Sequence, residues 1–334
     1  MKTEVLIVDP QSPETMPIAR GAEVLRRGGL VAFPTETVYG LGANALDANA
    51  VRRIFEAKGR PANNPIIVHI AEVEEAKQLL TVWSVAAERL AVRFWPGPLT
   101  LVLPRCDVVP DIVTANGPTV AVRMPAHPIA LALIRAAKVP VAAPSANRST
   151  QLSPTRAEHV LHGMQGCIDL LLDGGPTSGG LESTVLDLTS APPRLLRPGL
   201  ITRSEIEAII GPVVVPSAAP TGEVSLPSPG MLPRHYAPRT PLECAVDGRD
   251  RAKALLEAGL RIGRLALSDG GGLVLPGVTT VRMPAEPSAY AAQLYATLHL
   301  LDDAGLDRIV VDLPPDREEW LAIRDRLRRA SAPR

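Results

Sequence analysis

The feature that most constrains this chain is a proline-rich segment between residues 212 and 240. It holds seven prolines in 29 residues, and because proline lacks a backbone N–H, few donors remain there for a helix or a sheet. Helical and strand periodicities occur on both sides of it. We therefore expect one domain over 1–211, a stiff linker over 212–240, and a second, smaller domain over 241–334.

Short apolar strands and amphipathic helices alternate along the first 211 residues. A helix is predicted over 48–57, because Val51, Ile54 and Phe55 fall on one face. The strands predicted here are Leu30–Phe33, Pro65–Ile70, Leu99–Leu103, Val120–Arg123, Val141–Ala143, Ile168–Leu172, Thr184–Leu188 and Arg194–Leu196. The pattern predicts an α/β fold with a twisted open sheet, and the alternation after the linker predicts a second, small α/β domain.

The balance of charge argues against an extensive contact with nucleic acid. The chain has 35 basic and 35 acidic residues, divided as 20 and 20 over residues 1–211 and as 15 and 15 over residues 212–334. A nucleic-acid-binding domain is usually strongly basic. We therefore expect direct RNA binding to be weak or absent.

The apolar runs and the spacing of cysteine and histidine bear on where the protein acts and on whether it binds zinc. No run of about 18 apolar residues is present, so we expect no membrane span, and the first ten residues lack the apolar region of a signal peptide. The three cysteines form no CxxC pair, and His159 and His162 have no evident third partner for zinc. We expect a cytoplasmic protein.

Two segments at predicted strand or helix ends could carry chemistry. FPTETVYGLG at 33–42 brings hydroxyls and a carboxylate to a strand end, where α/β sheets often bind ligands. KGRPANNP at 58–65 places Lys58 and Arg60 around a glycine, a pair suited to phosphate oxygens. A solvated turn and a basic helix end are the simpler readings of these segments, and locally both stay open.

Further candidates follow other predicted strands. TVAVR at 119–123 ends in an arginine, and PSAN at 144–147 carries a serine and an asparagine that could serve as local caps or hold a phosphate. The glycine-rich stretch at 173–184 is no P-loop, because it lacks the GK[ST] ending and precedes a strand. SPGMLPRHY at 228–236 contains a histidine and a tyrosine that a simple spacer would not need.

Together these segments resemble the two-domain threonylcarbamoyl-AMP synthases, which combine a YrdC-like catalytic domain, a linker and a smaller C-terminal domain. The motifs that carry the resemblance are FPTETVYGLG, KGRPANNP, TVAVRMP, APSAN, LESTVLDL, RPG and SPGMLPRHY, in this order over residues 33–236. The region after the linker matches by position and α/β pattern only. The resemblance implies a YrdC-like twisted open sheet followed by a Rossmann-like domain.

The resemblance also implies a reaction. L-threonine, bicarbonate or CO2, and ATP would give threonylcarbamoyl-AMP and pyrophosphate, with Mg²⁺ accompanying the ATP on protein ligands that remain unknown. The product would pass to the machinery that transfers the threonylcarbamoyl group to tRNA next to the anticodon. Such a nucleotidyltransferase acts mainly by positioning its substrates and stabilising charge.

Site roles follow from the motif positions. Catalytic and phosphate contacts are implied for Lys58, Arg60, Ser145 and Asn147. The ATP site would comprise Arg60, Asn64, Thr119, Ser145, Ser153, Arg197 and Tyr236. The threonine site would comprise Thr37, His69, Arg123, Ala143 and Ser183, with Arg123 pairing with the substrate carboxylate. His235 and Tyr236 would form a lid that excludes water from the adenylate.

Two other functions fit parts of the sequence. An RNA-binding module would use the same domain, but the even charge weighs against it. A carbamoyltransferase that uses carbamoyl phosphate would normally carry additional acylphosphatase and zinc-finger regions. This chain has no CxxC pairs and lacks the length for those regions.

Overall fold

The larger part of the chain is built on one mixed sheet of ten strands. The computed structural model describes residues 2–216, 228, 230, 232–267 and 275–333. The strands are β1 (Glu4–Ile7), β2 (Val31–Phe33), β3 (Gly40–Asn44), β4 (Ile67–His69), β5 (Leu99–Pro104), β6 (Thr119–Arg123), β7 (Val141–Ala142), β8 (Leu170–Asp173), β9 (Thr184–Asp187) and β10 (Arg194–Arg197). Their spatial order is β1-β8-β2-β3-β7-β4-β6-β5-β9-β10, so strands distant in the sequence lie side by side.

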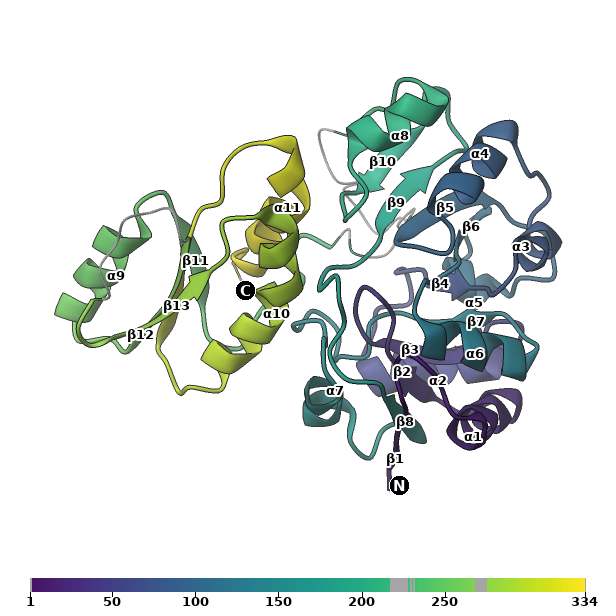
Figure 1. The fold of residues 1–334 in the computed structure, drawn as a ribbon, viewed down its shortest axis with the longest axis horizontal. Coiled ribbons are helices and arrows are strands. Elements are labelled where there is room, and N and C mark those ends of the chain that lie inside the picture. The colour runs from purple at the N-terminus through teal and green to yellow at the C-terminus, as the bar shows by residue number, and fades with distance from the viewer. Residues whose placement is uncertain (1, 217–227, 229, 231, 268–274, 334) are drawn as a thin grey trace.

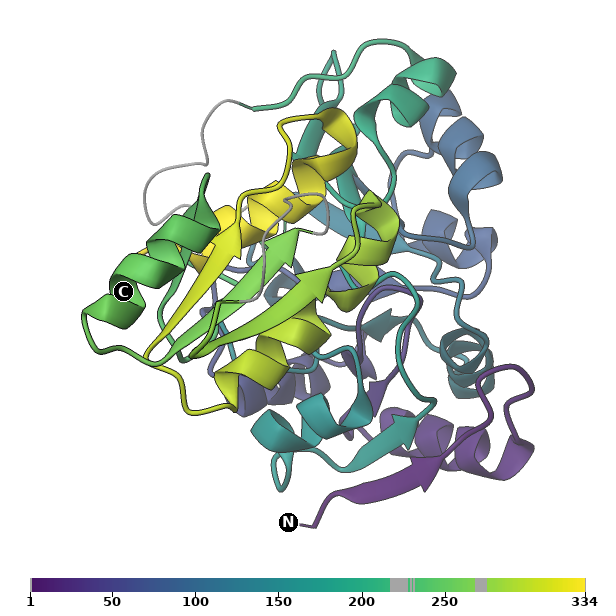
Figure 2. The same ribbon diagram turned by 60° about the vertical axis from the view of Figure 1, so that its left-hand side comes forward.

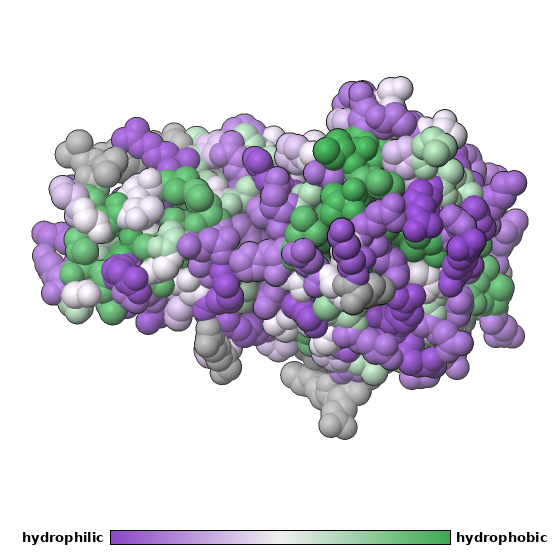
Figure 3. Space-filling model, turned by 90° about the horizontal axis from the view of Figure 1, so that it is seen from below, coloured by the Kyte–Doolittle hydropathy of each residue, from purple (hydrophilic) through white to green (hydrophobic). Residues whose placement is uncertain are grey.

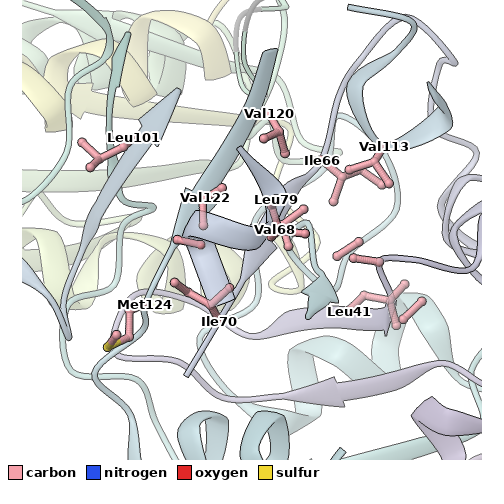
Figure 4. Packing of buried hydrophobic residues seen from close by; sticks show 14 of the residues in the cluster. Leu41, Ile66, Val68, Ile70, Leu79, Leu101, Val113, Val120, Val122 and Met124 are labelled. Carbon is pink, nitrogen blue, oxygen red and sulfur yellow. The ribbon is translucent and has the colours of Figure 1, made fainter. Parts of the chain in front are cut away.

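Helices cover the two faces of this sheet unequally. The helices of this part are α1 (Thr15–Arg26), α2 (Ala48–Lys58), α3 (Val73–Leu79), α4 (Val85–Phe94), α5 (Asp111–Thr114), α6 (Pro128–Ala137), α7 (Ala157–Met164) and α8 (Arg203–Ile210). On one face, α2, α3, α4 and α7 pack over the largest hydrophobic core, part of which Figure 4 shows around Val68, Val122 and Leu101. On the other face, α1 and α6 pack against residues of β1, β2, β7 and β8.

The incomplete cover on this second face positions the site. Side chains alternate between the faces along a strand, so Ile67 and His69 of β4 point to the same side as Ala121 and Arg123 of β6. Ile67 and Ala121 form a small apolar cluster there with residues of β5, β9 and β10. His69 and Arg123 therefore lie on the sheet face that α1 and α6 leave open.

Local sequence explains why helix α2 delivers two cations to this region. The helix begins after Asp47, whose side chain accepts hydrogen bonds from the backbone N–H groups of Asn49 and Ala50. It ends at Gly59, which adopts the left-handed conformation (φ 60°) that glycine tolerates best. The last helical residue is Lys58, and the chain turns so that Arg60 follows it toward the sheet.

The second domain is a small parallel sheet with helices on both faces. Its strands β11 (Leu242–Ala245), β12 (Ile262–Leu267), β13 (Val278–Met283) and β14 (Arg308–Asp312) are all parallel, in the order β11-β14-β12-β13. Helix α9 (Gly248–Glu257) covers one face, and α10 (Pro287–Asp302) and α11 (Leu321–Ala330), preceded by the 3₁₀ turn η1 (Glu318–Trp320), cover the other. Figure 2 shows these four strands side by side.

Helices α10 and α11 also face the larger domain. Figure 1 shows them between the two sheets, with α9 on the outer side. One hydrophobic cluster contains Val38, Leu152 and Leu181 of the larger domain together with Leu294 and Leu298 of α10. The two domains therefore share a continuous apolar contact rather than being tethered by the linker alone.

The predicted fold class is confirmed, with local differences. The large twisted sheet and the second α/β domain are both present. Strands β1 and β3 and the short helix α5 were missed. Much of the predicted proline-rich linker lies outside the described residues, which omit 217–227, 229 and 231. The domain limits at 211 and 240 stay predictions.

The outer surface carries both hydrophilic and hydrophobic residues. Figure 3 shows one face on which hydrophilic residues prevail and hydrophobic ones gather in patches on both domains. Over the described ranges, no helix combines the length and the apolar character that crossing a membrane requires.

Two glycines allow a direct test of the contact between the domains. Both Gly175 and Gly180 have positive φ, 77° and 73°, so an alanine at either position costs about 1–2 kcal/mol in backbone strain. A Cβ at Gly175 would meet no atom within 4 Å, whereas one at Gly180 would lie 2.3 Å from the carbonyl oxygen of Ala291 in α10.

We expect Gly180→Ala to destabilise the protein by about 1–3 kcal/mol more than Gly175→Ala, because helix α10 must move away. Urea unfolding of the two variants measures this difference. Equal losses of stability would contradict the close approach of the domains.

Candidate functional site

A pocket lies on the open face of the large sheet. Its lining comes from the loop between β2 and β3, the ends of β4, β6 and β10, the segments 143–145 and 182–183, and residues 230, 235 and 236. It is lined by Thr35, Thr37, Val38, Gly40, Arg60, Ile67, His69, Arg123, Ala143, Pro144, Ser145, Glu182, Ser183, Arg197, Gly230, His235 and Tyr236. The pocket thus gathers most of the motifs singled out in the sequence.

One end of the pocket is organised around Arg123, the last residue of β6. Its Nη2 donates to the Thr37 hydroxyl (3.0 Å) and its Nε to the carbonyl oxygen of Gly97 (3.2 Å). The guanidinium also forms an ion pair with Glu36, at 2.6 Å from Oε1. Arg123 is buried and is therefore already arranged to bind a carboxylate.

His69 lies beside Arg123 in the sheet register. Burial, and secondarily the positive charge of Arg123, lower the pKa of His69 to about 3. The imidazole is therefore neutral at physiological pH. It can exchange hydrogen bonds with a ligand without adding a further positive charge to this end of the pocket.

Lys58 has a different environment from the one that its motif suggested. Only 3% of the side chain is exposed, and Nζ donates to the carbonyl oxygens of Ser145 (2.6 Å) and Asn147. Burial, together with nearby Arg60 and Arg148, lowers the pKa of Lys58 well below its ordinary value. The ammonium group holds the loop 145–147 from behind and does not itself line the pocket.

Two arginines line the other end of the pocket. Arg60 donates to Asn64, at 3.0 Å to the backbone carbonyl and 2.7 Å to the side-chain oxygen, and to the carbonyl of Pro65 (2.6 Å). Arg197 donates to the carbonyl (3.0 Å) and the hydroxyl (3.1 Å) of Ser183. Burial lowers the pKa values of both guanidinium groups, which shows that their positive charge is poorly solvated.

His235 and Tyr236 close this end. Their rings lie 4.0 Å apart between centroids, and both residues are buried. Gly230 is required nearby, because a Cβ there would lie 2.4 Å from the Tyr236 hydroxyl. Within the described structure, His235 Nδ1 and Asn64 Nδ2 are buried without a hydrogen-bond partner, which is typical of groups that meet a polar ligand.

Most of the predicted site residues come together here, and five do not line the pocket. The residues off the pocket wall are Lys58, Asn64, Thr119, Asn147 and Ser153. Lys58 and Asn147 are joined behind the loop at 145–147, Asn64 supports Arg60, and Ser153 donates to Glu182. Thr119 begins β6, at the opposite end of that strand from Arg123. Their ligand contacts stay predictions.

Two carboxylates line the pocket; the sequence pointed to the carboxylate of FPTETVYGLG, which is Glu36, but neither Glu36 nor Glu182 was given a site role. Glu36 pairs with Arg123, and Glu182 pairs with Arg326 of helix α11 at 2.8 Å. Each acid directly precedes a predicted ligand contact in its motif, Thr37 in PTET and Ser183 in LEST. That adjacency was the available signal, but their arginine partners are distant in the sequence.

The charges favour an anionic ligand. Lys58, Arg60, Arg123 and Arg197 surround the pocket, against the two carboxylates of Glu36 and Glu182, and all six are largely buried. The cavity itself is small, about 50 Å³, against the roughly 300–1,000 Å³ of typical ligand sites.

Comparison with known proteins gives consistent matches over the whole chain. A family model named for Sua5, YciO and YrdC and described as "Telomere recombination" matches residues 23–199. A second model, the C-terminal domain of threonylcarbamoyl-AMP synthase, matches residues 201–332.

Individual relatives agree with these models. Threonylcarbamoyl-AMP synthase of Bacillus subtilis is 45% identical over 343 residues, covering 100% of this chain and 99% of the relative. The Pyrococcus abyssi enzyme of the same name is 46% identical and covers 95% of each chain. The crystal structure of P. abyssi Sua5 complexed with L-threonine has a TM-score of 0.91 at 45% identity over 98% of both chains.

The low pKa of His69 predicts a pH dependence of stability. The unfolded chain protonates this histidine near pH 6.5, whereas the folded chain does so only near pH 3. Stability is therefore lost as the pH falls below about 6.5, by up to about 2 kcal/mol at pH 5 from this residue. His69→Gln should reduce the loss between pH 7 and pH 5 by that amount in urea unfolding. Identical pH profiles for both proteins would contradict the assignment.

Proposed function

The chain belongs to the threonylcarbamoyl-AMP synthase family, and on that premise we propose that it condenses L-threonine, bicarbonate or CO2, and ATP. The products are threonylcarbamoyl-AMP and pyrophosphate, which makes the enzyme a nucleotidyltransferase. The observation that carries the proposal is a single pocket with a carboxylate-binding arginine at one end and a cluster of buried cations at the other.

Threonine is proposed to occupy the end around Arg123. Its carboxylate would pair with the guanidinium that Glu36 now contacts, close to the Thr37 hydroxyl. Neutral His69, the Ala143 backbone and Ser183 would hold the remaining polar groups. The Ser183 hydroxyl lies 2.7 Å from that of Thr100, which fixes its direction.

The triphosphate is proposed to lie toward Arg60, Arg197 and Ser145. The neutral threonine amine attacks the carbon of CO2 and releases a proton to solvent, or attacks that of bicarbonate and releases water, and either route gives the carbamate. An oxygen of the carbamate then attacks the α-phosphorus of ATP. The bond between the α- and β-phosphates breaks, and pyrophosphate leaves with that electron pair. Arg60 and Arg197 would stabilise the negative charge that develops on these oxygens.

Lys58 and Asn147 would act from behind this surface. The Lys58 ammonium holds the backbone of Ser145 and Asn147, so it would set the shape of the loop and add its charge to the local potential. Asn64 would orient Arg60 in the same way, and Ser153 and Thr119 would contribute from the edge of the nucleotide site.

His235 and Tyr236 are proposed to act as a lid. A cavity of about 50 Å³ cannot hold a nucleotide and an amino acid. The segment carrying these two rings would therefore open for substrates to enter, and close again to exclude water from the reactive adenylate.

Mg²⁺ is proposed to arrive with the ATP phosphates. Among the described residues, no group of three or more His, Cys, Asp or Glu side chains is placed to hold a metal ion. The two pocket carboxylates, Glu36 and Glu182, are paired with arginines. The protein groups therefore do not form a cation site by themselves, and no step above depends on one.

The proposed partners follow from the chemistry of the product. A mixed anhydride of a carbamate and a phosphate is an activated acyl donor, so it would pass to an enzyme that transfers the threonylcarbamoyl group to tRNA. We propose that this chain binds RNA weakly or not at all, in keeping with its even charge, and that it acts in the cytoplasm.

Pyrophosphate release tests the reaction. We expect release only when threonine, bicarbonate and ATP are all present, with a sharp decrease when threonine is omitted. Release that does not depend on threonine would overturn the proposal. Tight tRNA binding with a steep salt dependence, without pyrophosphate release, would favour the RNA-binding alternative.

A lysine pair tests the site. Lys58→Ala should lower kcat/KM for ATP by about 100-fold or more, because the loop at 145–147 loses its anchor. Lys77→Ala is the matched control, since Lys77 is exposed on α3, where it pairs with surface glutamates and lies over the ring of Trp83, away from the pocket. Equal activities of the two variants would exclude a role for Lys58.

A further inference from the structure

Helix α11 of the second domain places one arginine behind the pocket wall, against Glu182. Arg326 is only 1% exposed. Its Nε donates to Glu182 Oε2 (2.8 Å), its Nη2 to the carbonyl of Pro198 (3.0 Å), and its Nη1 to Asp325 (2.9 Å). Two of these three acceptors belong to the larger domain, in or beside the LEST and RPG motifs.

Glu182 is the centre of this contact. It lines the pocket and accepts hydrogen bonds from the Ser153 hydroxyl, from the Tyr295 hydroxyl of α10 (3.1 Å) and from Arg326. Burial alone would raise the pKa of this carboxyl, but the nearby Arg326 and Arg197 hold it below its ordinary value. Glu182 therefore stays ionised next to the proposed triphosphate position.

The same helix holds the proposed lid. The Arg326 guanidinium carbon lies 5.0 Å from the centroid of the Tyr236 ring, within range of a cation–π interaction. Arg329, one turn further along, donates to the carbonyl of Leu232 (2.8 Å), and its own carbonyl accepts from the N–H of His235 (3.3 Å). Helix α11 thus contacts the segment 232–236 at three points.

The charges of Glu182 and Arg326 have opposite effects on an anionic ligand. An unpaired carboxylate at Glu182 would repel the phosphates of a nucleotide across a poorly solvated pocket. Arg326 compensates this charge from the side away from the pocket, so that Glu182 can orient Ser153 without opposing an anion. The second domain thus supplies part of the compensation, because Arg326 of α11 acts on Glu182 beside Arg197 of the larger domain.

We propose that Arg326 is a positioning residue for the nucleotide site, through which the second domain neutralises Glu182 and fixes Tyr236 over the pocket. The inference rests on the proposed function for its assignment of this pocket to ATP. It assigns to the second domain a part in ATP binding.

Calorimetric titration of the full-length protein with ATP measures how each variant changes ATP affinity. Steady-state pyrophosphate release measures KM for ATP and for threonine. Arg326→Gln should weaken ATP binding by 10-fold or more and raise KM for ATP, while KM for threonine changes less than about 3-fold. Glu182→Gln should not weaken ATP binding. The double variant should return to within about 3-fold of the original affinity, because the uncompensated charge is gone.

Arg328→Ala is the matched control. Arg328 lies on the same helix and also contacts Asp325, but its side chain is 77% exposed. It should leave ATP affinity unchanged. A merely structural role for Arg326 would instead lower the thermal stability or kcat of the single and double variants together, with ATP affinity unchanged, and would overturn the proposal.

Two further outcomes are decisive. If Arg326→Gln does not fold, the double variant replaces it, and weak ATP binding by a folded double variant overturns the proposal. If the unmodified protein binds ATP but releases no pyrophosphate with threonine, the proposed reaction is wrong. The ATP affinities of the single and double variants then still test the role of Arg326.

Discussion

Burying a cation costs several kcal/mol unless charges or oriented dipoles compensate it, and five cations are buried around one pocket in this protein. Lys58 and Arg60 are compensated mainly by backbone carbonyls, whereas Arg123 and Arg326 each contact a carboxylate. Apart from Asp325 of helix α11, which also pairs with Arg326, these compensating groups belong to loops next to sheet strands. The conformations of these loops are therefore coupled to the charges they stabilise.

The second domain contributes side chains that contact the charged groups around the pocket. Its sheet is parallel and has helices on both faces, so it has a hydrophobic core of its own. Helices α10 and α11 nevertheless direct Tyr295 and Arg326 out of that domain and onto Glu182. The apolar contact that includes Leu181 and Leu294 keeps the two domains close enough for this ion pair to form.

Much of this arrangement was predictable from local sequence, and the rest depends on long-range contacts. Strands β4 and β6 were predicted because they are continuous apolar runs. The end of β6 pointed to Arg123, whereas a role for His69 was suggested only by the family resemblance. Strand β3 was missed because Gly40 and Gly42 are typical of a turn, whereas here the missing side chains leave room for Phe33. Strand β1, with the sequence EVLI, was missed although it is mostly apolar and alternates in exposure as an edge strand does. Long-range pairs have no signature in a single sequence. The carbonyl partners of Lys58 lie 87 and 89 residues away from it, and Arg326 lies 144 residues away from Glu182.

The bonds from Lys58 to the loop at 145–147 have a consequence for how a ligand would be bound. They join the end of helix α2 to a turn almost ninety residues later, so the two motifs form one preorganised unit. Because this unit is already ordered, a ligand that contacts it loses little binding free energy to ordering it. The entropic cost of association then arises chiefly from ordering His235 and Tyr236 on the other side of the pocket. Differences in residence time among ligands would therefore originate at these two rings.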